Sequence, residues 1–129
     1  MKKIFFTLSL FGVAFLLWGG RAHAQAAHAP ALLRHIVIIT FKQGAPPDSI
    51  KALDDIYTAL SKSPVVKDFE MGVNISPRDT TAVKHVYVTS FVSKEDMQQY
   101  RKIPEYARLF KVSLAIADDV NVVDYWINK

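Results

Sequence analysis

Apolar positions gather in four short runs along the chain. The first, at about 34–42, is apolar at every position from Ile36 to Ile39, which is typical of a strand buried on both faces. The second, at about 67–76, alternates between apolar and polar residues, which predicts a strand with one face exposed to solvent. The third and fourth runs cover about 84–92 and 120–127. The pattern therefore predicts four strands.

Two longer segments between these runs repeat their apolar residues at helical spacing. The first helix is expected to be capped by Asp48 or Ser49 and to end at Ser63-Pro64. The second helix is expected to start at Ser93 as its cap, followed by an acidic residue three positions later. Pro104 lies within its pattern and predicts a kink or a break into two helices. The expected apolar face of the last part comprises Tyr106, Leu109, Phe110, Leu114 and Ala117.

The order strand–helix–strand therefore occurs twice along the chain, and the first and third predicted strands share a sequence signature. Arg34–Phe41 and Lys84–Phe91 each open with a cation and a histidine and close with a phenylalanine. With right-handed crossovers this order predicts an α+β fold, a ferredoxin-like βαββαβ sandwich with its helices on one face of the sheet. We expect the first and third strands to be central, parallel neighbours, with His35 and His85 side by side.

The other face of that sheet has nothing in the chain to cover it. Since the first and third strands are apolar on both faces, a second copy of the same sheet is the simplest cover. The sequence therefore predicts a symmetric homodimer.

The N-terminal residues have the pattern of a secretory leader. Lys2 and Lys3 precede an apolar stretch at 4–18, and Ala22-His23-Ala24 offers small residues for cleavage. We expect residues 1–24 to be a signal peptide, 25–32 a flexible tether and 33–128 the folded domain. The protein would then be periplasmic or secreted, without membrane association after cleavage. The alternative is an uncleaved anchor.

Charge and cysteine content exclude several functions. The whole chain has a net charge of +4, but without residues 1–24 it has 13 basic and 12 acidic residues, or about +1. With no basic stripe interleaved with aromatic residues, nucleic-acid binding is not expected. The chain has no cysteine, which excludes disulfides, thiolate catalysis and a lipoprotein anchor.

From about Leu33 to Ile127 the chain resembles the stress-responsive dimeric α/β-barrel (Dabb) family. The resemblance is carried by Arg34-His35-Ile36-Val37, by 69–76, by 85–91, by Tyr100 before Pro104, and by Asp124-Tyr125. It implies a ferredoxin-like monomer whose sheet pairs with a second copy to close a barrel.

One plant branch of that family is a polyketide cyclase with a His-Pro-x-His segment, whose second histidine is the acid/base group. Here the segment reads Ile103-Pro104-Glu105-Tyr106, so Tyr106 stands at the position of the catalytic histidine. The resemblance matches Tyr100 to the assisting tyrosine, and His35 and His85 to the strand histidines.

The residues nominate one candidate site. His35, His85 and Tyr100 are candidate proton-transfer residues, and Asn74, Tyr106 and Trp126 are candidate pocket residues. The alternative is that both histidines make structural hydrogen bonds and the aromatic residues belong to the core. Two histidines without a third ligand predict no metal site, and nothing indicates a cofactor.

Three functions stay open from the sequence. We expect an exported, stress-responsive dimer that binds a small apolar or aromatic ligand. The first alternative is a cofactor-independent enzyme resembling a polyketide cyclase, isomerase or monooxygenase, with His35, His85 and Tyr100 carrying the proton transfers. The second alternative is an interaction module, for which the sequence specifies no partner surface.

Overall fold

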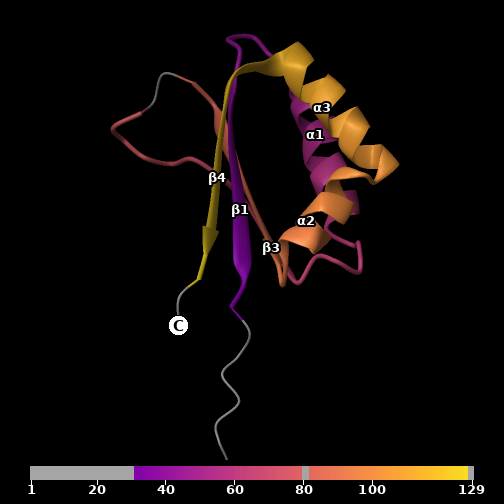
Figure 1. Cartoon of the computed structure of the whole chain (residues 1–129). Helices are drawn as coiled ribbons and strands as arrows, with labels where there is room; N and C mark the ends of the chain where they lie inside the picture. Colours follow the sequence, from indigo (N-terminus) through magenta and orange to yellow (C-terminus); the bar gives the residue numbers. More distant parts are fainter. Residues whose placement is uncertain (1–30, 80–81, 128–129) are drawn as a thin grey trace, which may run out of the picture.

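The computed structural model describes residues 31–79 and 82–127, which form one sheet and three helices in a two-layer arrangement (Figure 1). The predicted signal peptide, nearly all of the predicted tether and residue 128 lie outside the described residues. Within the described residues, no helix is both long and apolar enough to cross a membrane. The elements in chain order are β1 (Leu33–Phe41), α1 (Pro47–Leu60), β2 (Asp68–Val73), β3 (Lys84–Phe91), α2 (Lys94–Arg101), α3 (Pro104–Ile116) and β4 (Ala117–Trp126).

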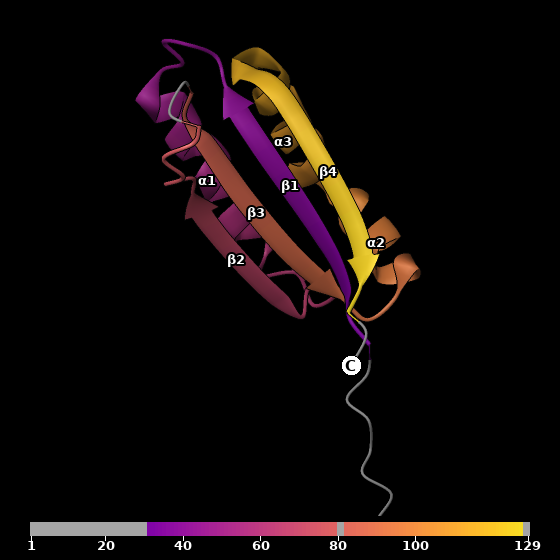
Figure 2. The same cartoon turned by 90° about the vertical axis from the view of Figure 1, so that its left-hand side faces the viewer.

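The four strands form one antiparallel sheet in the order β2-β3-β1-β4 (Figure 2). All three helices lie on one face of it (Figure 1). The predicted α+β ferredoxin-like fold and the central position of β1 and β3 are confirmed.

The predicted parallel pairing of β1 with β3 is wrong. Helix α1 makes β1 and β2 parallel to each other, but β3 is inserted between them and runs back from β2, so it is antiparallel to β1. His35 is therefore opposite Thr89, and His85 is opposite Ile39. Four strand positions separate the two histidines, which at about 3.3 Å per residue is roughly 13 Å.

The helix-facing side of the sheet carries the core. In β1 every second residue from Leu33 to Phe41 is buried, and Tyr87 and Phe91 of β3 are fully buried beside them. The α1 residues that close over these strands are Leu53, Ile56, Tyr57 and Leu60, as the helical spacing predicts.

The other side of the sheet, here called the open face, is not covered by any described element. Alternate β1 residues such as Ile36 and Ile38 point there and are only partly buried, and Val123 of β4 is 51% exposed. Arg34 crosses the same face to contact Glu70 at 3.3 Å and Asp68 at 3.6 Å. Apolar residues at the centre and an ion pair at the border make this the unpartnered surface that the sequence predicts.

Two helix features are confirmed and two are corrected. The Ser93 side chain accepts a hydrogen bond from the Asp96 N–H, and Pro104 opens a separate helix, α3. Helix α1, in contrast, has Pro46 as its N-cap without a side-chain cap. The predicted apolar face of α3 is also displaced, because its buried residues are Leu109, Ser113 and Ile116.

Candidate functional site

A cavity of about 250 Å³ lies between the sheet and the helices α2 and α3. Its floor is formed by β1 and β4, and its walls by aromatic and aliphatic side chains of the helices. This volume is just below the range of roughly 300–1,000 Å³ that is typical of ligand pockets, and it corresponds to about eight water molecules. The lining residues are His35, Val37, Ile39, Tyr57, Tyr100, Arg101, Tyr106, Leu109, Phe110, Ser113, Leu114, Val120 and Val122.

His35 is the histidine that lines the cavity. It is 4% exposed on β1, and the strand register places Asp124 of β4 directly opposite it on the same face. His35 Nδ1 lies 2.6 Å from Asp124 Oδ1. Since a carboxylate can only accept, Nδ1 carries the hydrogen, and in the neutral ring Nε2 is left as an acceptor. Arg101 lies 3.7 Å from the other Asp124 oxygen.

Tyr100 of α2 lines the same cavity as His35. It is 1% exposed, and its ring contacts Phe91 at 5.2 Å and Tyr106 at 5.5 Å between centroids. Burial raises the pKa of Tyr100 to about 12, against a smaller lowering by a hydrogen bond with Thr89. Tyr100 is therefore a neutral hydroxyl at neutral pH, able to donate a hydrogen bond but unsuited as a base.

His85 does not belong to this cavity. It is 8% exposed, its Nδ1 lies 2.9 Å from Asp54 Oδ1 of α1, and its ring is in edge contact with Phe41. The hydroxyl of Tyr87 donates to the same Asp54 oxygen at 2.6 Å. His85 is thus part of a buried network that ties α1 to β3, and the predicted grouping with His35 and Tyr100 is wrong because the strands are antiparallel.

Tyr57 lies between the two histidine clusters. Its ring stacks on Tyr87 at 3.6 Å, while its edge lines the cavity that contains His35. Burial is the main cause that raises the pKa of both Tyr57 and Tyr87, and for Tyr87 the hydrogen bond to Asp54 adds to it. Both phenols stay protonated, so the boundary between the clusters carries no charge.

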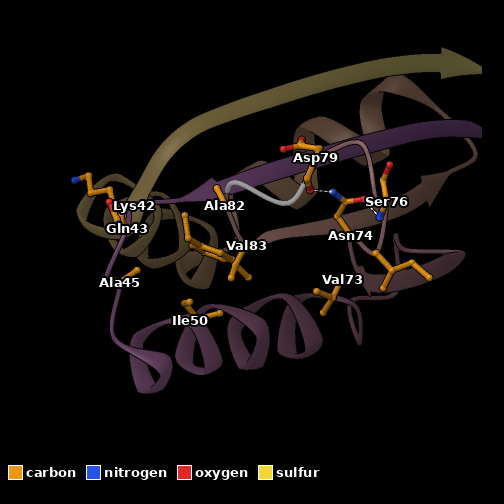
Figure 3. A pocket seen from close by; sticks show the side chains of 13 residues that line it. Lys42, Gln43, Ala45, Ile50, Val73, Asn74, Ser76, Asp79, Ala82 and Val83 are labelled. Atoms are coloured by element: carbon orange, nitrogen blue, oxygen red, sulfur yellow. Dashed lines mark hydrogen bonds between the residues drawn. The ribbon is translucent and has the colours of Figure 1, made fainter.

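Asn74 borders a different, open groove of about 440 Å³ beside the 74–83 loop (Figure 3). Its side chain accepts from the Ser76 N–H at 3.0 Å and reaches the Asp79 carbonyl at 3.5 Å. Asn74 therefore shapes its own loop and is not in the cavity. Trp126 lies two residues beyond Asp124 on the same face, opposite Leu33, and does not line the cavity either.

The two carboxylates that pair with the histidines were not predicted as site residues from the sequence. Asp54 lies on α1, and its side chain is only 20% exposed because it contacts His85 and Tyr87 of β3. Asp124 is the partner of His35 through the β1–β4 register, which the order and direction of the strands alone do not give. The described residues include no group of three or more side chains arranged to hold a metal ion.

Comparisons with known proteins agree with this fold. The model of the stress responsive A/B barrel domain matches residues 33–127. A stress-response A/B barrel domain-containing protein, HS1 of Arabidopsis thaliana, is 27% identical over 95 residues, covering 72% of this chain and 87% of HS1.

Solved structures give the same result. A hydroxynitrile lyase from Passiflora edulis is 24% identical with a TM-score of 0.68, over 78% of this chain and 97% of the lyase. A dimeric ferredoxin-like protein of unknown function from Thermobifida fusca is 14% identical with a TM-score of 0.65, over 75% of this chain and 92% of that protein. The chain belongs to the stress-responsive A/B barrel domain family.

Proposed function

We propose that this protein is an exported homodimer that binds a small apolar or aromatic molecule in the cavity beside His35. The observation that carries the proposal is the cavity itself, whose apolar walls end at a single hydrogen-bonded histidine. A small volume limits the ligand to about one ring or a short branched chain.

The polar groups of the cavity define the head of that ligand. Asp124 keeps the hydrogen of His35 on Nδ1, so Nε2 accepts, whereas the Tyr100 hydroxyl donates. A ligand hydroxyl matches the chemistry of both groups, because it can donate to an acceptor such as Nε2 and accept from a donor such as the Tyr100 hydroxyl. We therefore infer that phenols and small hydroxylated apolar compounds bind more tightly than hydrocarbons of the same size.

Phenol, cyclohexanol and toluene are suitable probes, with binding followed by ligand-observed NMR. Saturable binding of phenol is expected, and Val122→Phe should abolish it by filling the cavity. Val83→Phe is the matched control, because Val83 has the same 52% exposure as Val122 and lies outside the cavity. Equal loss in both variants, or no saturable binding by the wild type, would overturn the proposal.

The homodimer is supported by the open face and by the dimeric ferredoxin-like neighbours. Val88, partly buried at the centre of that face, gives the sharpest test. Val88→Asp should shift the protein to the mass of one chain in analytical ultracentrifugation, since an unpaired carboxylate at an apolar interface is costly. Val83→Asp, outside the open face, should leave the mass at two chains.

Export is supported by the leader pattern alone. Fractionation of a bacterial host that expresses the full chain, with mass spectrometry of the N-terminus, tests it. A soluble periplasmic product that begins at Gln25 is expected. A membrane-bound product that retains residues 4–18 would establish the anchor alternative.

A second candidate function is supported by the short His35–Asp124 contact. With Asp124 to stabilise the charged ring, His35 Nε2 can take a proton from a carbon next to a carbonyl group, while Tyr100 donates a hydrogen bond to the enolate oxygen that forms. The proton then returns from Nε2 to carbon. At 24% identity the hydroxynitrile lyase shares only the fold, so its reaction gives no support here.

Deuterium exchange into phenylacetaldehyde in D₂O, followed by NMR, tests this proton transfer. The wild type should accelerate the exchange, and His35→Ala should remove the acceleration. His85→Ala is the control that should retain it, because His85 does not line the cavity. A rate equal to that of buffer in the wild type would leave binding as the function.

A further inference from the structure

Exposed apolar side chains lie at the entrance of the cavity. The sequence pattern predicted that two of them, Phe110 and Leu114, would lie on the apolar face of the helix. Phe110 is 61% exposed and Leu114 63%, and both line the cavity. Val120 and Val122 of β4 lie across the mouth at 44% and 52% exposure. We call these four residues the apolar rim. Such a patch around a cavity entrance is typical of an interaction surface.

The segment that carries α3 has a net positive charge. Residues 101–116 contain four cations and one acid, Glu105, a net charge of +3, whereas the rest of the chain from Gln25 onward has a net charge of −2. The cations are Arg101, Lys102, Arg108 and Lys111, and all four are exposed. On α3, Lys111 is three positions before Leu114 and therefore lies beside it on the helix surface.

We propose that this surface docks on an anionic phospholipid bilayer and that the ligand enters the cavity from that bilayer. A helix with large apolar side chains next to lysine and arginine is the arrangement that lies in the interface of a membrane with anionic lipids. Asp118 and Asp119 follow the end of α3, so the attraction is greatest at the middle of the helix, around Phe110 and Lys111.

Docking is compatible with the proposed dimer. The open face is on the opposite side of the sheet from the helices (Figures 1 and 2), so α3 stays accessible when two open faces meet. Docking departs from the sequence-based expectation of no membrane association after cleavage of the leader, because α3 exposes Phe110 and Leu114 at the surface. Entry of the ligand from the bilayer rests on the proposed ligand-binding function, whereas docking itself does not.

Co-sedimentation with vesicles tests the docking. The processed protein is recovered from the exporting host, because residual leader would itself bind lipid, and is mixed with vesicles of phosphatidylcholine with or without 30% phosphatidylglycerol. Binding to the anionic vesicles is expected at 50 mM NaCl, with little binding to phosphatidylcholine alone and a marked decrease at 500 mM NaCl.

Two double variants locate the contact. Arg108→Gln with Lys111→Gln should weaken binding about 25-fold, at about fivefold for each cation near an anionic surface. Its control, Arg78→Gln with Lys94→Gln, removes the same charge elsewhere and should have little effect. Phe110→Ser with Leu114→Ser should also reduce binding, and its control is Ile75→Ser with Val83→Ser, both exposed residues.

Three results would overturn the proposal. The first is absence of wild-type binding to anionic vesicles. The second is equal loss in the test and control variants. The third is a lower mass of the Phe110→Ser, Leu114→Ser variant in ultracentrifugation, which would assign the apolar rim to contact between copies of this chain. Phenol binding is measured separately by NMR, so failure of docking and failure of ligand binding are distinguishable.

Discussion

The two histidine–aspartate pairs have almost the same local chemistry and different surroundings. His35 contacts Asp124 at 2.6 Å and His85 contacts Asp54 at 2.9 Å, in both cases through Nδ1. Around His35 lies a cavity walled by Tyr100 and Tyr106, whereas around His85 the rings of Tyr87 and Phe41 are packed.

The difference comes from the origin of each aspartate. Asp124 lies on the strand next to His35, so their contact stays within the sheet and leaves space above it. Asp54 lies on α1, so its contacts with His85 and Tyr87 join the helix layer to the sheet. The same sequence signature therefore contributes to a candidate site in β1, whereas in β3 it joins the helix layer to the sheet.

Loss of Asp54 should have the largest effect on stability. Asp54→Ala leaves His85 Nδ1 and the Tyr87 hydroxyl without their acceptor, and at 1–3 kcal/mol for each buried unpaired group we expect a loss of about 3 kcal/mol. Urea denaturation measures it. The matched variant Asp124→Ala should lose about 1 kcal/mol or less, because that carboxylate is 36% exposed and water can replace it. Equal losses would mean that the two histidine–aspartate pairs contribute equally to the stability of the fold.

Substitution of each histidine in turn should show which of the two histidine–aspartate pairs takes part in ligand binding. His35→Ala removes the acceptor in the cavity and should weaken phenol binding about tenfold, which corresponds to about 1.4 kcal/mol for one hydrogen bond. His85→Ala should leave phenol affinity unchanged while it lowers stability. Titration by NMR gives both affinities, and a weaker affinity in His85→Ala would place that residue in the site.

Alkaline pH should destabilise the fold through its buried tyrosines. The pKa values of Tyr57, Tyr87 and Tyr100 are raised in the folded state, so above pH 10 the unfolded chain loses protons that the folded chain keeps. Stability is therefore complete below pH 10 and falls as pH rises, by about 1 kcal/mol per buried tyrosine at pH 11. Urea titrations at pH 8 to 11 measure the slope.

Tyr87→Phe should make that alkaline slope shallower, since it removes one raised pKa. The same slope in wild type and in Tyr87→Phe would show that Tyr87 is not the buried phenol that the network requires.

The smallest effect is expected at Arg101. Its distance of 3.7 Å to Asp124 and its 41% exposed side chain describe a solvated ion pair. Arg101→Gln should change stability by less than about 0.5 kcal/mol. A much larger loss would mean that Arg101, rather than Asp124 alone, holds His35 in place.

Much of this fold is predictable from local patterns. The four strands, the Ser93 cap and the break at Pro104 follow from alternation, capping chemistry and the missing N–H of proline. Strand direction does not follow from a shared signature, because the position of β3 between β1 and β2 reverses it. For that reason the two histidines were predicted together and lie apart.

The candidate site was predictable only in part. His35, Tyr100 and Tyr106 do line one cavity, as their residue types suggested. The outward position of Phe110 was not predictable from apolar spacing, because Ser113 takes a buried position by donating its hydroxyl to the Leu109 carbonyl at 2.9 Å. A buried serine rotates the core face of α3 and leaves Phe110 and Leu114 at the surface.

The resonances of the histidine ring nitrogens offer the most direct test of the cavity as a binding site. With ¹⁵N-labelled histidine, His35 and His85 are assigned from the two alanine variants, and phenol is added to saturation. A hydrogen bond from phenol should shift the Nε2 resonance of His35 and leave both nitrogens of His85 unchanged, because only His35 lines the cavity. An unchanged His35 resonance, or an equal shift in both rings, would contradict a binding site at His35.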